Sequence, residues 1–181
     1  MFKPQKRINE NAVKKDFFGK RKVNSTKFIE IELHPKSINH IEVSELKNIE
    51  FPEKDGVLFV NCTKSKSTSD FLFNITPSEL IVICSRLNQK SYNELKNKNI
   101  IGFGISERVL QNNPEFYQEV SSNFKIKLNK NHCKITAFIL GQNYIVIEGS
   151  GNPSINARNE TYIISNSEMK YNEIKTFFEN A

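Results

Sequence analysis

The chain has 181 residues, of which 38% are hydrophobic and 25% are charged. A chain of this length and composition can bury the core of one ordinary domain, which argues against wholesale disorder. The longest apolar runs are far too short to span a bilayer, and the charged N-terminus lacks a signal-peptide core. We therefore expect a protein without a membrane-spanning segment that works in the cytoplasm.

The net charge of +6 is concentrated at the N-terminal end of the sequence. Residues 1–27 contain nine basic and two acidic residues, a net charge of +7, so the rest of the chain carries about −1. Such a basic arm is typical of segments that follow a polyanion such as nucleic acid, and a solvated, partly disordered terminus explains it equally well. We expect an arm over residues 1–27 and a single domain over residues 28–181.

The three cysteines, Cys62, Cys84 and Cys133, lie within or beside apolar stretches. This placement favours buried thiols in a reducing compartment over a disulfide framework. Cys133 in particular is expected to point into the core. Neither the cysteines nor the histidines have the spacing of a metal-binding motif, so we predict no metal site.

The predicted elements alternate between strands and helices along the chain. A half-buried strand at residues 28–33 is followed by a second strand around Ile41 and Val43, a turn at 52–56 and a fully buried strand at 57–60. The later elements are a short helix before Phe73, an inner strand at 80–84, a helix at 89–98, an inner strand at 100–105, a helix at 114–120, a strand at 124–128, two hairpin strands at 134–140 and 144–147, a strand at 161–164, and a helix from about Ser167 to Phe178. This order indicates an α/β fold in which helices cover both faces of a mixed sheet. The side chains expected in its core include those of Phe71, Phe73, Phe116, Phe177 and Phe178.

The predicted hairpin brings together residues that are about twenty positions apart. His132 and Lys134 stand where its first strand begins, and Ser150 and Asn152 follow its second strand. In a hairpin the start of one strand faces the end of the next, so these four residues are expected to be neighbours. Because side chains alternate along a strand, His132 and Lys134 are expected on one face.

These residue types suit phosphate chemistry. Imidazole is a nucleophile and a proton carrier near neutral pH, which suits His132. The ammonium of Lys134 and the amide of Asn152 can hold phosphoryl oxygens. Gly149 and Gly151 would allow the backbone to approach a substrate closely.

The pattern His-x-Lys followed by Gly-Ser-x-Asn resembles the signature of the phospholipase D-like superfamily. It is carried by His132, Lys134, Gly149, Ser150 and Asn152. The resemblance is best from about residue 57 to the C-terminus, and it points to a branch of short proteins with one motif per chain that is often met in phages and other mobile elements. It implies a phospholipase D-like mixed sheet with helices on both faces.

One position departs from the family pattern. Two further residues, Glu160 and Arg158, are candidates for roles in the site. The superfamily usually has an acid five residues after the lysine, a mainly structural group, whereas this chain has Ile139. Glu160 matches the acid that orients the histidine ring in the family. Arg158 could pair with a substrate phosphate or with a surface carboxylate.

The family mechanism uses two motifs in each active site, so the resemblance implies a homodimer in which two copies of His132 face each other. One His132 would attack phosphorus and form a phosphohistidine, and the partner's His132 would protonate the leaving oxygen and then activate water. Lys134 and Asn152 from both chains would hold the nonbridging oxygens. The mechanism requires neither a metal nor another cofactor.

Our leading hypothesis is a metal-independent phosphodiesterase that cuts nucleic acid, with DNA favoured over RNA. Lys125 and Lys127 lead toward His132 and could guide nucleic acid, or could be only the solvated side of a strand. One alternative is a nucleic-acid-binding or phage structural module that has the fold but no turnover, which the missing acid at Ile139 favours. Another is an enzyme that acts on small phosphodiesters, for which the basic arm would be irrelevant.

Overall fold

The computed structural model describes residues 35–47, 49–65, 68–72, 74–129, 132–151 and 158–180. These residues all belong to one compact unit. The basic arm and the strand expected at residues 28–33 lie outside the described residues, as does the predicted boundary between arm and domain.

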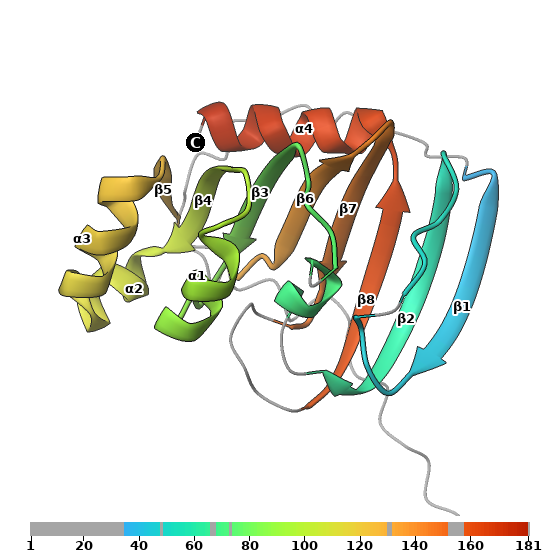
Figure 1. The fold of residues 1–181 in the computed structure, drawn as a ribbon, viewed down its shortest axis with the longest axis horizontal. Helices are drawn as coiled ribbons and strands as arrows, with labels where there is room; N and C mark the ends of the chain where they lie inside the picture. Colours follow the sequence, from blue (N-terminus) through green and yellow to red (C-terminus); the bar gives the residue numbers. More distant parts are fainter. Residues whose placement is uncertain are drawn as a thin grey trace, which may run out of the picture. The chain divides into compact units, whose positions relative to one another are not determined.

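One eight-stranded sheet runs through this unit in the order β1-β2-β8-β7-β6-β3-β4-β5 (Figure 1). Strand β1 is parallel to β2, and β3, β4 and β5 are parallel to one another, whereas the remaining neighbours are antiparallel. The strands are β1 (Ser37–Val43), β2 (Gly56–Ser65), β3 (Glu79–Cys84), β4 (Ile100–Ser106), β5 (Ile126–Asn129), β6 (Ile135–Leu140), β7 (Asn143–Gly149) and β8 (Arg158–Asn166).

Helices cover both faces of the sheet. They are the 3₁₀ helix η2 (Thr68–Leu72) and the α-helices α1 (Gln89–Leu95), α2 (Glu107–Asn112), α3 (Pro114–Asn123) and α4 (Glu168–Asn180). Figure 1 shows α1, α2 and α3 gathered at the β3–β5 end of the sheet, and α4 running across the inner strands. The structure thus confirms the predicted mixed α/β architecture.

Strand β3 shows why this sheet needs two covering layers. Its side chains alternate between two buried clusters, with Val82 on the side of α1 and α3 and Ile81 and Ile83 on the side of α4. A strand that is buried on both faces must be apolar at successive positions, which accounts for the continuous apolar run at 80–84. The predicted inner strand is therefore confirmed.

Among the described residues, the other half of the sheet is covered on one face only, and here the expectation of a fully buried strand was wrong. The predicted strand at 57–60 is part of the longer β2, in which Leu58 and Val60 are buried but Phe59 is only partly covered. Helix α4 packs against β6 and β7, so the Phe59 side of β2 lies beyond it. Ile38 and Ile163 remain 57% and 38% exposed in this half of the sheet.

Local sequence signals explain where the helices begin. The Asn113 side chain caps α3 with Pro114 in its first turn, and the Ser167 hydroxyl accepts a hydrogen bond from the Lys170 amide at the start of α4. These two helices and α1 were predicted, whereas α2 was not.

Helix α4 anchors itself through one of its two neighbouring phenylalanines. The Phe178 ring is buried and lies where a Cβ on Gly102 of β4 would be, only 2.1 Å from it. Phe177, expected in the core, is instead 50% exposed, because consecutive residues of a helix point in different directions. Phe71 and Phe116 are buried as expected, and Phe73 lies outside the described residues.

Candidate functional site

The β6–β7 hairpin brings the two halves of the motif to one end of the sheet. Ile135 pairs with Glu148, and one step further the Gly149 amide donates a hydrogen bond of 3.2 Å to the Lys134 carbonyl. The predicted proximity of the Lys134 and Gly149 segments is therefore confirmed. Asn152 lies outside the described residues.

His132 and Lys134 precede β6 instead of forming its first residues. The Lys134 ammonium donates a hydrogen bond of 2.8 Å to the His132 carbonyl, which folds this short loop back on itself. Because the strand begins only at Ile135, the alternation expected for residues 132–134 does not apply. Cys133 is consequently exposed, and the prediction that it points into the core was wrong.

The motif serine is joined to β8. The Ser150 hydroxyl hydrogen bonds with the Glu160 carboxylate and accepts a bond of 3.1 Å from the Thr161 amide. The Ser150 amide in turn donates to the Thr161 carbonyl at 3.1 Å. Glu160 therefore contacts Ser150, and among the described residues no group hydrogen bonds to the imidazole of His132. The role of Glu160 in orienting His132 stays a prediction.

Close packing against β8 requires glycine at both glycine positions of the motif. A Cβ on Gly149 would lie 2.5 Å from the Thr161 carbonyl oxygen, and one on Gly151 would lie 2.3 Å from the Tyr162 hydroxyl oxygen. Tyr162 is only 2% exposed, so it has little room to move away. Larger residues at both positions would displace β8 from β7.

Two of the three basic residues that were proposed to bind substrate, Lys125 and Lys127, contact helix α4 and not His132. The ammonium of Lys125 lies 5.6 Å from the centroid of the Phe178 ring, and that of Lys127 donates to the Glu179 carbonyl at 3.1 Å. Both cations thus lie against the C-terminal turn of α4, where positive charge is favourable. Arg158 opens β8, and its side chain is not described.

His132 lines a pocket of about 440 Å³ at the carboxyl ends of β3 and β4. Further lining residues come from the segments that follow these strands and from the starts of α1, α2 and α3, and they include Arg86 and Arg108. Neither arginine was singled out from the sequence. The available signal was their position directly after two buried strands, because the carboxyl ends of parallel strands form the usual ligand crevice of an α/β sheet.

A second hollow, of about 370 Å³, contains the other half of the motif. Gly149 and Ser150 line it together with residues of β2 and β8 and with His40 of β1. The His40 ring is stacked on Phe59 with a centroid separation of 4.7 Å and an interplanar angle of 8°. The described motif residues therefore open onto two hollows, with His132 in one and Ser150 in the other.

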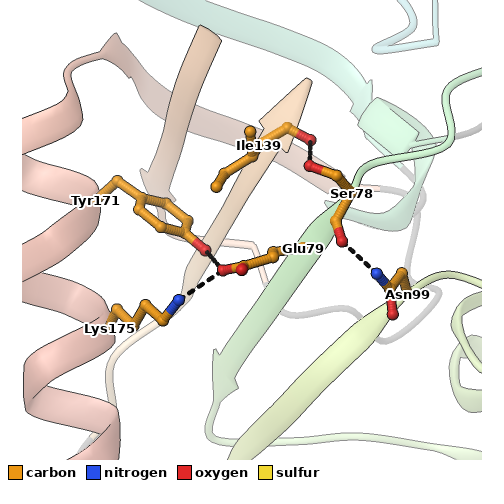
Figure 2. Close-up of polar contacts among 6 residues, drawn as sticks. All are labelled: Ser78, Glu79, Asn99, Ile139, Tyr171 and Lys175. Carbon is orange, nitrogen blue, oxygen red and sulfur yellow. Dashed lines mark hydrogen bonds and ion pairs between the residues drawn. The ribbon is translucent and has the colours of Figure 1, made fainter. Parts of the chain in front are cut away.

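The far end of the hairpin carries the position where the family acid is missing. Ile139 pairs with Glu79 of β3, and the Glu79 carboxylate accepts hydrogen bonds from the Lys175 ammonium at 2.7 Å and the Tyr171 hydroxyl at 2.8 Å (Figure 2). The bond from Lys175, followed by that from Tyr171, lowers the pKa of Glu79. Burial, with Glu79 as the next cause, raises the pKa of Tyr171. An acid on the neighbouring strand thus ties α4 to the sheet beside Ile139.

The same end is closed by backbone contacts. The Ser78 hydroxyl donates to the Ile139 carbonyl at 3.4 Å, and the Asn99 side-chain amide hydrogen bonds to the Ser78 carbonyl (Figure 2). The Ser78 backbone amide donates to the same Ile139 carbonyl at 2.9 Å. These bonds hold the starts of β3 and β4 against the end of β6.

Two further features are absent from the described residues. No group of three or more His, Cys, Asp or Glu side chains in this part of the chain is placed to hold a metal ion. No helix formed by these residues is long and apolar enough to cross a membrane.

Comparisons with known proteins give little further information. No protein-family model matches the chain, and no curated protein matches it. Among solved structures, the chain is similar to TrmBL2, an archaeal chromatin protein whose structure shows a novel mode of DNA binding. The match has a TM-score of 0.44 and 10% sequence identity, and it covers 74% of this chain. The chain spans 52% of the length of TrmBL2.

Proposed function

We propose that this protein is a phospholipase D-like phosphodiesterase that cleaves nucleic acid through His132 in a homodimeric active site. The observation that carries the proposal is the hydrogen bond from the Gly149 amide to the Lys134 carbonyl, because it joins both halves of the motif at one end of the sheet. At this end His132 lines a pocket without any acidic lining residue. The described side chains that line the pocket carry no negative charge that would repel a phosphodiester, and the nearby Glu119 carboxylate is bound by the lining residue Gln89.

In the first step an imidazole nitrogen of His132 attacks phosphorus, the phosphorus–nitrogen bond forms and the bond to the leaving oxygen breaks. The partner's His132 gives its proton to that oxygen. In the second step the same partner imidazole takes a proton from water, the water oxygen attacks phosphorus, and the phosphorus–nitrogen bond breaks. Lys134 and Asn152 stabilise the charge that develops on the nonbridging oxygens.

The dimer supplies what one chain lacks. The attacking imidazole and the imidazole that protonates the leaving group are the same residue in two copies, so a single chain has only half of the machinery. Light scattering at micromolar concentration is expected to give the mass of two chains. Full activity of a monomeric protein would contradict the shared site.

The first experiment is cleavage of labelled plasmid and single-stranded DNA in excess EDTA by the wild-type protein and by His132→Ala. We expect cleavage that survives EDTA and disappears with the substitution. The matched control is Glu79→Gln on β3, which lies beside the far end of the hairpin, and this variant should still cut. Cleavage that stops with EDTA, or that continues in His132→Ala, would contradict the proposal.

A second candidate function is a nucleic-acid-binding module without turnover. The observation that favours it is that Glu160 hydrogen bonds with Ser150, while no group in the described part of the chain holds the His132 ring. A wild-type protein that shifts DNA on a gel and cuts neither DNA substrate would establish this function in place of the nuclease.

A further inference from the structure

The pocket beside His132 is lined by two arginines from different parts of the chain. Arg86 follows β3 in the connection to α1, and Arg108 lies in the first turn of α2 after β4. Since β3 and β4 are parallel neighbours, both segments leave the sheet at the same edge. The volume of about 440 Å³ lies within the range of about 300–1,000 Å³ that is typical of ligand pockets.

Among the residues that the structure describes, no carboxylate forms an ion pair with either guanidinium group. The lining contains no aspartate or glutamate, and within the described part of the chain neither Arg86 nor Arg108 has an ion-pair partner. Lysines elsewhere in the same domain do find carboxylates, such as Lys170 with Glu148 and Lys175 with Glu79. In the described part of the chain, the pocket therefore gathers two guanidinium groups that no carboxylate pairs with, while the nearby Glu119 is bound to Gln89.

The neutral part of the lining is also able to donate hydrogen bonds. Asn88 and Asn113 use their Oδ1 atoms to accept bonds from the Ser91 and Phe116 amides, as N-cap residues do. Both residues line the pocket, and each also has an Nδ2 group that can donate hydrogen bonds. Guanidinium and amide donors without a competing acid suit a phosphate oxygen, and arginine binds phosphate through two parallel hydrogen bonds.

We propose that Arg86 and Arg108 bind a phosphate of the substrate other than the one that His132 attacks. The pocket is larger than a single phosphate group needs, and its cations come from segments separate from the His132 loop. The substrate would thus be a chain with neighbouring phosphates, that is an oligonucleotide, in preference to a small diester with one phosphate. This inference rests on the proposed function, since it assigns the attacked phosphate to His132.

The test compares binding of thymidine 3′,5′-bisphosphate and thymidine 5′-monophosphate by calorimetry at one fixed salt concentration. We expect the wild-type protein to bind the bisphosphate at least about tenfold more tightly than the monophosphate. The double variant Arg86→Gln/Arg108→Gln should lose this preference. Its fold is checked by circular dichroism, and the single variant Arg108→Gln gives a second, milder test.

The matched control removes two positive charges that do not line the pocket. In Lys90→Gln/Lys96→Gln both exposed lysines lie on or directly after α1, and the bisphosphate preference should stay within about twofold of wild type. An equal loss in the control and in the arginine variant would overturn the inference, because the effect would then be one of net charge. Unchanged preference in the arginine variant would overturn it as well.

Cleavage of DNA, measured on the same proteins, separates this inference from the proposed function. Wild-type protein that prefers the bisphosphate through the arginines but cuts no DNA would overturn the nuclease and leave the arginines as a phosphate site. Protein that cuts DNA through His132 but shows no arginine-dependent preference would keep the nuclease and overturn the second phosphate site.

Discussion

The two ends of the β6–β7 hairpin lie in contrasting environments. At the turn end, Glu79 beside Ile139 is bound by both Lys175 and Tyr171, and backbone bonds close the sheet around it. At the open end, His132 and Cys133 are exposed, and the Lys134 ammonium donates to the His132 carbonyl within its own loop. The same two strands therefore have a closed polar network at one end and an accessible one at the other.

The difference shows how one hairpin can separate stability from function. Polar groups that already have charged partners are satisfied by the fold and gain little from a ligand. Cations without a carboxylate partner can still gain a charge-assisted bond when an anion binds. Substitutions at the turn end should therefore act on stability, and those of His132 and Lys134 at the open end on activity.

The largest expected effect compares two lysines, one at each end. Lys134→Met should lower kcat/KM for DNA cleavage by about 10²–10³, the usual loss when one donor to a developing oxyanion is removed. Its free energy of unfolding should change by less than about 1 kcal/mol, because it loses only one exposed hydrogen bond.

Lys175→Met is the matched control for Lys134→Met. It should leave kcat/KM within about twofold and reduce the free energy of unfolding by about 1 kcal/mol, since the pair it breaks is partly exposed. Urea denaturation and initial cleavage rates of both variants give the two quantities. The same pattern of losses in both variants would remove the contrast between the two ends.

The next effect is the pH dependence of the turn end. The pKa of Glu79 lies below its ordinary value of 4.5, chiefly because of the bond from Lys175. Folding thus favours the charged carboxylate, so its contribution to stability is present above pH 4.5 and is lost as the pH falls through the lowered pKa. Urea denaturation of wild type and Glu79→Gln should differ by about 1 kcal/mol at pH 7 and converge in acid. A difference that stays constant with pH would contradict this assignment.

Much of this fold could be predicted because the deciding signals are local. The continuous apolar run of β3 and the capping residues Asn113 and Ser167 each act within a few positions of the sequence. The hairpin was also predicted from its short connection, in which Gly141 has a positive φ of 61°, although the turn is one residue shorter than expected because Asn143 already pairs with Leu140. The proximity of the two motif segments was therefore predictable from the sequence.

The features that could not be predicted depend on the order of the strands in the sheet or on the residue at which a strand begins. Arg86 and Arg108 become neighbours of His132 only because β4, β3 and β6 are adjacent in the sheet, which their sequence separation does not reveal. Cys133 was placed in the core because the strand was expected to begin at Lys134, whereas it begins at Ile135. Side chains before a strand do not follow its alternation.

A smaller effect concerns the link between the open end and β8. Ser150→Ala removes the acceptor of the Thr161 amide and the partner of Glu160, so the free energy of unfolding should fall by about 1 kcal/mol. Ser150→Thr keeps the hydroxyl and should recover most of that loss. The control is Ser122→Ala, whose hydroxyl bonds only to the Gln118 carbonyl within α3 and should cost less than about 0.5 kcal/mol. Equal losses at Ser150 and Ser122 would show that the link to β8 carries no stability.

The smallest perturbation is chemical labelling of the thiols, because it starts from the native protein without any substitution. Cys133 is exposed at the open end, whereas Cys62 and Cys84 are buried, and burial raises the pKa of Cys84 to about 12. A disulfide reagent such as Ellman's reagent reacts with thiolates, so one thiol should react quickly in the native protein and the other two only on unfolding. Cys133→Ser should abolish the fast phase. Because Cys133 adjoins His132, an oligonucleotide bound at the open end should slow this phase. A fast phase that survives Cys133→Ser would contradict the assignment, because it would show that the buried thiols, including Cys84 at the end of β3, readily become accessible to the reagent.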